Sequence, residues 1–245
     1  MFSYENEFAK LQREFQIRFL SNKKYQKEYK LFQNNTFEMN LVDLYCLAVT
    51  KWFNNFIKAF EFFENENIIH QEYEVTENTI SNVYDILIRD LRDHVINIAS
   101  YHDLLLHLLN EIYEIKSDSK NLSWDYIAQG ICEESVKQQM TKIYSYMRKE
   151  IPYRNAVLHD MNFLWIDNYL TIEMNQLCSI LQFDDDEMKK LLDPLREPIC
   201  IRLRSLISQI QNEEKERFNN IKKETEKLFV LLCNPYNKRI KSLMK

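Results

Sequence analysis

The sequence contains very little glycine, and this shortage excludes several ways of binding a phosphate group. Gly130 is the one glycine among 245 residues, where average usage would give about 17. P-loops and dinucleotide-binding loops need two or three glycines close together, and kinase-type phosphate loops need several. The sequence therefore excludes these nucleotide-binding folds. It also disfavours a β-sandwich or barrel, because their many tight turns use glycine.

Proline, long apolar runs and paired cysteines are scarce as well. Only four prolines occur, so few positions interrupt a helix. No apolar run approaches the ~18 residues of a membrane-spanning helix, and residues 1–7 lack the basic segment typical of a signal peptide. The five cysteines form no Cys-x-x-Cys pair, which favours a reduced chain. We therefore expect a cytoplasmic protein with no membrane partner.

The remaining composition is that of an ordinary globular protein, with 45% hydrophobic and 28% charged residues. The net charge of −5 argues against a protein that coats nucleic acid by bulk charge, but it allows a local basic site. Apolar residues recur at the three- and four-residue spacing of amphipathic helices along most of the chain. We therefore predict an all-α helical bundle that forms a single domain over residues 1–245.

The same spacing predicts where the helices lie. We expect Thr76 to cap the helix that carries Ile80 and Leu87, Pro152 to start a new helix, and Pro235 to begin a basic tail. The predicted helical ranges are 4–32, 39–64, 76–115, 124–131, 133–150, 152–169, 170–182, 185–192 and 198–231.

Residues 151–160 hold the side chains with the clearest chemistry. Pro152 favours the first turn of a helix, where free N–H groups attract phosphate. Arg154 adds a planar cation suited to phosphate oxygens, and His159 can transfer protons near neutral pH. Asn155 and His159 share a helix face. Because Arg154 and His159 lie roughly 140° apart around one helix, two copies meeting across a symmetric interface would be needed to close the site.

This segment resembles the R-x4–6-H motif of the HEPN superfamily in its Arg-Asn-x-x-x-His form. The resemblance implies a four-helix core over about 39–169, with additions at 1–35 and 170–245. It further implies a homodimeric endoribonuclease, independent of metal and of any cofactor, that acts in defence, toxin–antitoxin or stress-related RNA cleavage.

The resemblance also assigns roles to the motif residues. Arg154 would bind the scissile phosphate, and His159 would assist attack by the ribose 2′-hydroxyl or protonate the leaving oxygen. Asn155 would support both steps. The implied partners are RNA, a second copy of the chain through the motif-bearing helices, and an antitoxin or sensor protein.

Basic residues just before the motif are candidates for contacting an RNA backbone. The predicted RNA-binding residues are Lys142, Arg148, Lys149 and Tyr153.

Other patterns are interpreted as structural. A second R-x4-H match runs from Arg89 to His94 and lies among carboxylates, so we interpret it as a solvated, salt-bridged helix face. Asp103 and His107 share a helix face but lack the further ligands of a metal site. The acidic run 184–186 favours the start of a helix, and the aromatic stripe from Trp52 to Phe63 favours a helical core over a base-stacking platform. We predict no metal site.

Two other functions fit the same sequence. The helical fold would also serve as a non-catalytic module that binds a nucleotide or assembles with a partner protein. An unrelated helical adaptor is the third alternative.

Overall fold

The computed structural model describes residues 6–22, 39–115, 122–153, 157 and 186–245. Within these ranges every regular element is helical and no strand occurs, which confirms the predicted all-α helical bundle. None of the helices in the described ranges combines the length and apolarity that crossing a membrane requires.

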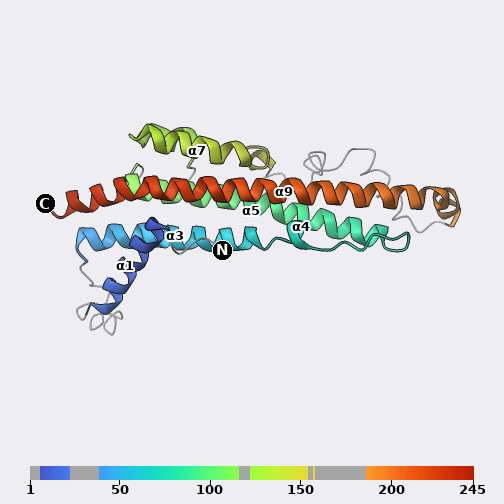
Figure 1. Ribbon diagram of the computed structural model, residues 1–245, viewed down its shortest axis with the longest axis horizontal. Coiled ribbons are helices and arrows are strands. Elements are labelled where there is room, and N and C mark those ends of the chain that lie inside the picture. Colours follow the sequence, from blue (N-terminus) through green and yellow to red (C-terminus); the bar gives the residue numbers. More distant parts are fainter. Residues whose placement is uncertain (1–5, 23–38, 116–121, 154–156, 158–185) are drawn as a thin grey trace. The chain divides into compact units, whose positions relative to one another are not determined.

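The helices follow the amphipathic pattern of the sequence, and Figure 1 labels most of them. Val136, Met140, Ile143 and Met147 are buried as expected from their spacing. The helices are α1 (Glu7–Ser21), α3 (Leu41–Glu64), α4 (Asn67–His70), α5 (Ile80–Tyr113), α6 (Trp124–Gly130), α7 (Glu134–Met147), the 3-10 turn η2 (Ile151–Tyr153) and α9 (Asp186–Leu243).

Two local predictions differ from the structure. The stretch expected as a loop after α3 contains the short helix α4. The residue at the start of α5 is Thr79 rather than Thr76, since the Thr79 hydroxyl accepts a hydrogen bond from the Thr76 backbone N–H at 2.8 Å. The Thr79 carbonyl oxygen then accepts the first helical hydrogen bond, from Val83 N–H. A β-turn thus precedes α5, and its two threonines satisfy each other's polar groups.

The prediction of separate helices at 185–192 and 198–231, followed by a basic tail from Pro235, was wrong. Helix α9 runs without interruption from Asp186 to Leu243 and includes Pro194, Pro198 and Pro235. A proline inside a helix removes one backbone hydrogen bond and crowds the preceding turn. Here buried apolar residues flank the prolines, among them Ile199 and Tyr236. Their burial offsets the local cost, so tertiary packing overrides the helix-breaking tendency.

The single glycine has a packing role. Gly130 has no positive φ, so its conformation is one that any residue adopts. A Cβ atom at this position would lie 2.5 Å from Cγ1 and 2.7 Å from Cγ2 of Ile115. The end of α6 therefore approaches the residue that follows α5 more closely than a side chain permits.

The described residues belong to two compact units. Unit 1 comprises the described residues within 1–61, 101–146 and 221–245, and unit 2 comprises those within 62–100 and 147–220. Helices α3, α5 and α9 contribute to both units. Residues 221–245, expected as an addition to the core, supply core side chains to unit 1. The single-domain organisation stays a prediction.

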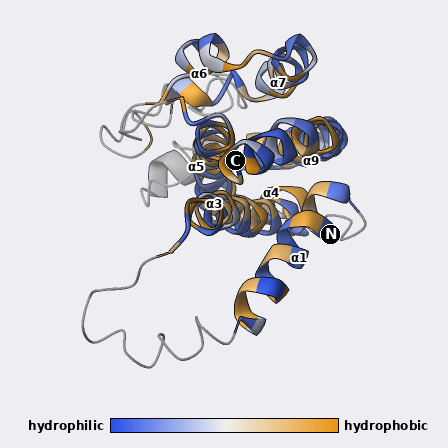
Figure 2. Ribbon diagram, turned by 90° about the vertical axis from the view of Figure 1, so that its left-hand side faces the viewer, coloured by the Kyte–Doolittle hydropathy of each residue, from blue (hydrophilic) through white to orange (hydrophobic). Residues whose placement is uncertain are grey.

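Aromatic side chains form the core of unit 1, where α3, α5 and the last part of α9 lie side by side (Figure 1). The Phe229 ring of α9 lies 5.7 Å from Phe8 of α1 and 5.4 and 5.3 Å from Phe53 and Phe56 of α3. Figure 2 shows hydrophobic residues prevailing along α3, whereas α1 alternates hydrophobic and hydrophilic residues. The predicted aromatic stripe is therefore core, which favours packing over base stacking.

Side chains of α9 hold the extended segment before α5 within unit 2. Gln211 donates to the Gln71 carbonyl at 2.8 Å, and Arg204 Nε donates to the Val75 carbonyl at 2.9 Å. Arg196 adds a hydrogen bond to the Glu77 carbonyl at 3.2 Å. These bonds satisfy carbonyls of a segment that has no regular partner strand or helix.

Candidate functional site

The three predicted catalytic residues, Arg154, Asn155 and His159, lie outside the described residues. Their roles therefore stay predictions. The structure does describe the chain up to Tyr153, together with Val157, which is buried. The surroundings of Tyr153 show how the chain enters the motif.

A 3-10 turn leads into the motif, where the sequence predicted the start of a new helix at Pro152. The Tyr153 N–H donates to the Glu150 carbonyl at 2.9 Å and closes this turn. Pro152 is exposed and Tyr153 is half-buried. Because Pro152 has no N–H of its own to satisfy, it suits such a turn. The chain thus reaches Arg154 through a hydrogen-bonded turn.

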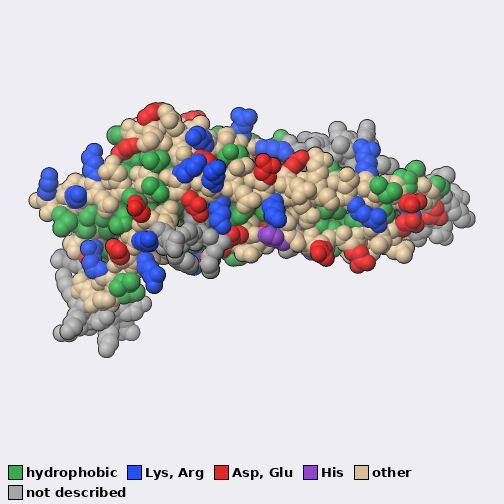
Figure 3. All heavy atoms as spheres, viewed as in Figure 1, with side chains coloured by type: hydrophobic (Ala, Val, Ile, Leu, Met, Phe, Trp, Pro, Cys, Tyr) green, Lys and Arg blue, Asp and Glu red, His purple; other side chains and the backbone are tan. Residues whose placement is uncertain are grey.

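The basic residues predicted to bind RNA are at the surface. Lys142, near the end of α7 in unit 1, is exposed, as are Arg148 and Lys149 of unit 2. Figure 3 shows Lys and Arg side chains interspersed with acidic ones on the face it draws, several of them over α7. These side chains are therefore accessible to an anionic partner.

Lys142 has a basic neighbour on α9 that the sequence did not indicate. Within unit 1, Gln139 of α7 donates to the Glu224 carboxylate at 2.7 Å, and Lys227 Nζ lies 2.6 Å from the same carboxylate. Hydrogen bonds from Lys227 and Gln139, with the charge of Lys142, lower the pKa of Glu224. Glu224 is thus held as an anion between two lysines of different helices, and the second lysine is apparent only in the fold.

A buried charge network is the most developed polar site of unit 2. His94 of α5 is fully buried, and its two ring nitrogens face carboxylates. Nδ1 contacts Glu66, and Nε2 lies 2.8 Å from Glu214 of α9. Burial alone lowers the pKa of His94, but the charges of Glu66 and Glu214 raise it, and this favours a proton on each ring nitrogen because ionised carboxylates only accept hydrogen bonds. His94 is therefore an imidazolium ion in the protein interior.

Arg217 extends this network toward the motif. Its Nε donates to Glu214 at 2.8 Å, and its Nη1 forms an ion pair with Glu150. The Arg217 side chain is 14% exposed and that of Glu150 is 1% exposed. The planar guanidinium group thus bridges two buried carboxylates, as its forked set of donors allows.

The network's charges nearly balance. Three carboxylates (Glu66, Glu150 and Glu214) face two cations (His94 and Arg217). Burial alone would lower the pKa of His94, but Glu66 and Glu214 raise it to about 9. Burial would raise the pKa of Glu214, but His94 and Arg217 hold it below its usual value. His94 and Glu214 are therefore kept ionised by their neighbours, despite the cost of burial.

The interpretation of Arg89–His94 as a solvated face was wrong for two of its residues. Arg89 is exposed, but Asp90 and His94 are buried. Asp90 accepts a hydrogen bond from the Tyr73 hydroxyl at 2.8 Å. The periodicity contained the signal, because His94 lies on the same face as the apolar residues Leu91 and Ile98. Glu214 likewise occupies an apolar position between Ile210 and Phe218 on α9.

Several candidates for metal binding and nucleophilic chemistry pack against other side chains or are buried. The described residues contain no cluster of three His, Cys, Asp or Glu side chains arranged to hold a metal ion. His107 stacks on Trp52 with ring centroids 4.1 Å apart. Cys46 and Cys200 are buried, and burial raises the pKa of both thiols. Cys178 and most of the acidic run 184–186 lie outside the described ranges.

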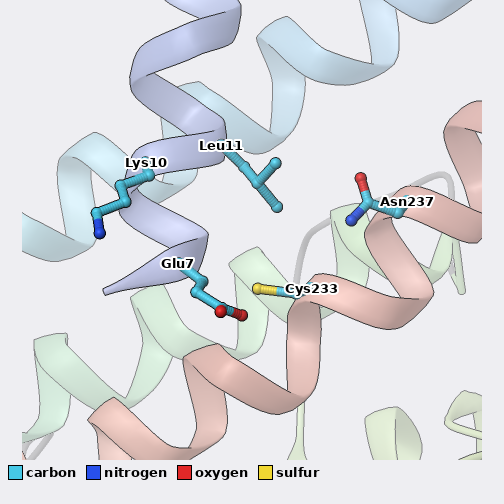
Figure 4. A pocket seen from close by; sticks show the side chains of 5 residues that line it. All are labelled: Glu7, Lys10, Leu11, Cys233 and Asn237. Carbon is cyan, nitrogen blue, oxygen red and sulfur yellow. The ribbon is translucent and has the colours of Figure 1, made fainter. Parts of the chain in front are cut away.

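A pocket of about 270 Å³ lies in unit 1 between α1 and α9 (Figure 4). The Glu7 carboxylate points toward the Cys233 sulfur in this view. Burial and the nearby Glu7 charge raise the pKa of Cys233 to about 11, so this thiol is protonated at neutral pH and is a poor nucleophile. Lys10, Leu11 and Asn237 complete the lining. The pocket therefore provides no reactive thiol.

Neither family models, nor curated proteins, nor solved structures match this chain. The case for a function therefore depends on the motif and on the described residues around it.

The buried network predicts how stability depends on pH. His94 has a raised pKa, so its contribution is complete below the ordinary value of 6.5 and is lost as pH rises through about 9. The contribution of Glu214 is complete above the ordinary value of 4.5 and is lost as pH falls. We expect the free energy of unfolding to drop by about 3 kcal/mol between neutral pH and pH ~10 because of His94.

Urea denaturation at a series of pH values measures this dependence. The His94→Gln variant is the control, since tyrosines and cysteines also titrate in the alkaline range. The slope that the wild type shows and the variant lacks belongs to His94. Equal slopes in both proteins would contradict the assignment.

Proposed function

We propose that this protein is a metal-independent endoribonuclease of the HEPN type that acts as a homodimer. The motif from Arg154 to His159 carries the proposal. Two observations on the described residues support it. The fold is all-α, and the motif directly follows a hydrogen-bonded turn whose first residue, Glu150, is anchored to α9 by an ion pair.

The proposed reaction is an internal transesterification of RNA. The ribose 2′-oxygen bonds to the adjacent phosphorus, and the bond from phosphorus to the 5′-oxygen of the next nucleotide breaks. A base removes the 2′-hydroxyl proton, and an acid gives a proton to the leaving 5′-oxygen. His159 serves one of these steps, and Arg154 stabilises the charge on the phosphate oxygens. The products carry a 2′,3′-cyclic phosphate and a 5′-hydroxyl.

Exposed basic residues support an RNA substrate. Arg148 and Lys149 lie only a few residues before Arg154, and both are exposed. Permanent positive charge next to a phosphate-binding arginine lowers the cost of bringing an anionic strand to the site. Biological settings that suit such an enzyme are defence, toxin–antitoxin function or stress-related RNA cleavage, with an antitoxin or sensor protein as a further partner.

The test is RNA cleavage without divalent metal ions. Purified protein is incubated in EDTA with end-labelled RNA that contains single-stranded and hairpin regions, and with DNA of the same sequence as the matched control. We expect fragments with 5′-hydroxyl and 2′,3′-cyclic phosphate ends from the RNA and no cleavage of the DNA, which lacks the attacking hydroxyl. Intact RNA, or fragments with 5′-phosphates, would overturn the proposal. Intact RNA together with a co-purifying protein would favour a non-catalytic assembly module.

A further inference from the structure

Glu150 is a buried carboxylate placed immediately before the candidate site. It is 1% exposed, and its carbonyl oxygen accepts the hydrogen bond from Tyr153 N–H that closes η2. Arg154 follows Tyr153 directly in the chain. Any shift of Glu150 is therefore passed through one short hydrogen-bonded turn to the point where the motif begins.

Arg217 determines where the Glu150 side chain is held. One side of its guanidinium group binds Glu150, and Nε donates to Glu214 at 2.8 Å. A lysine has a single ammonium group in place of this planar fork, so it does not hold two carboxylates in the same geometry. The turn before the motif is thus bound to α9 by the ion pair between Arg217 and Glu150, whose geometry is restricted.

The other end of the network is equally restricted. Glu214 accepts from the fully buried His94 of α5, which also binds Glu66. The Phe63 ring lies 5.8 Å from the His94 ring and 4.9 Å from Phe218 of α9, so apolar groups surround the charges. The anchor of Glu150 therefore extends through α9 to α5 and the segment after α3. Because these charges are buried, their role is to fix the relative positions of the side chains rather than to make the surface soluble.

We infer that Arg217 is a positioning residue for the proposed ribonuclease, acting through Glu150 on the turn from Glu150 to Tyr153. This inference rests on the proposed function, since it concerns the same site. Arg217 takes no part in proton transfer or phosphate binding. Its effect is on the geometry of the reaction, where a displacement of ~1 Å can lower the rate by about 100-fold.

The experiment compares Arg217→Met with Glu150→Gln and with the double variant. Each single substitution is expected to lower kcat for RNA cleavage by about 10- to 100-fold, with KM changed less than about 3-fold. Because both act through one contact, the double variant should lose no more than the larger single loss. Glu150→Gln keeps the shape of the side chain, so it remains informative if Arg217→Met folds poorly.

Arg204→Met is the matched control. Arg204 lies on α9 in the same unit, and its partner is the Val75 carbonyl rather than Glu150. We expect this variant to lose stability but to keep kcat within about 2-fold. An equal loss of kcat in Arg204→Met would overturn the inference, because the effect would then be general destabilisation.

Hydrogen exchange separates this inference from the proposed function, because it needs no RNA. Mass spectrometry is expected to show faster exchange in the peptide covering 150–153 of Arg217→Met, with unchanged exchange in 41–61 of unit 1. If wild-type protein leaves RNA intact, the proposed function fails. If exchange in the peptide 150–153 of Arg217→Met also stays as slow as in the wild type, the coupling between Arg217 and the turn is overturned as well. If the wild type cleaves RNA, unchanged kcat in Arg217→Met or additive losses in the double variant would overturn the positioning role alone.

Discussion

Replacing Arg154 by alanine is expected to lower the rate of RNA cleavage by about 10²- to 10³-fold, and His159→Ala by about 10²- to 10⁴-fold. In the proposed mechanism, alanine at position 154 removes the permanent cation that would stabilise charge on the phosphate in the transition state. Alanine at position 159 removes the group that would transfer a proton near neutral pH. Cleavage in EDTA, measured as initial rates on the same RNA, gives both values.

The chain provides its own control for this prediction. Arg89 and His94 form a second R-x4-H pair, but Arg89 is exposed and paired with Asp90 at 3.6 Å, while His94 is buried. Arg89→Ala should therefore keep the full rate. We also expect Arg154→Ala and His159→Ala to keep the melting temperature and the oligomeric state of the wild type, whatever that state is. Full activity in these two variants would show that the cleavage belongs to another site or to a contaminant.

Replacing His94 by leucine is expected to lower the free energy of unfolding by about 3–5 kcal/mol. Leucine fills much of the same space but removes the one cation between Glu66 and Glu214. Glu66 then loses its His94 partner, and Glu214 keeps only Arg217. The cost of an uncompensated buried charge exceeds that of a lost neutral hydrogen bond. Urea denaturation at pH 7, followed by far-UV circular dichroism, measures the change.

Two further variants separate the charge effect from a packing effect. Adding Glu66→Gln and Glu214→Gln to His94→Leu should recover part of the lost stability, because amides carry no charge to bury. His70→Leu replaces an exposed histidine of the same unit and should change stability by less than about 0.5 kcal/mol. A loss below about 1 kcal/mol for His94→Leu would contradict the ionised network.

Periodicity alone was enough to predict most of the described helices. The range 39–64 predicted α3, which spans Leu41–Glu64, and 124–131 predicted α6, which spans Trp124–Gly130. Helical spacing can be recognised in the sequence because each apolar residue repeats along one face of one element. The candidate motif was equally a local signal, since Pro152, Arg154 and His159 lie within eight consecutive residues.

The interior charges were harder to predict. His94 and Glu214 each occupy a position of their own helix where the spacing predicts an apolar residue. This pattern shows that a polar residue faces the interior, but it does not identify the residue that pairs with it. They lie 120 residues apart, and only the packing of α9 on α5 brings them to hydrogen-bond distance. A charged residue is stable in the protein interior only when another element supplies a partner of opposite charge. The residues next to it in the sequence do not identify that partner.

The sequence by itself therefore determined the all-α class, most helix positions and the motif that suggests RNA cleavage, because each depends on residues close together in the chain. The tertiary structure decided that α9 continues through Pro194, Pro198 and Pro235, since packing on both sides of the prolines offsets their local cost. It also decided that Arg217 holds Glu150 at the entrance to the motif. That contact joins two residues distant in sequence, and it exists only once the helices have packed.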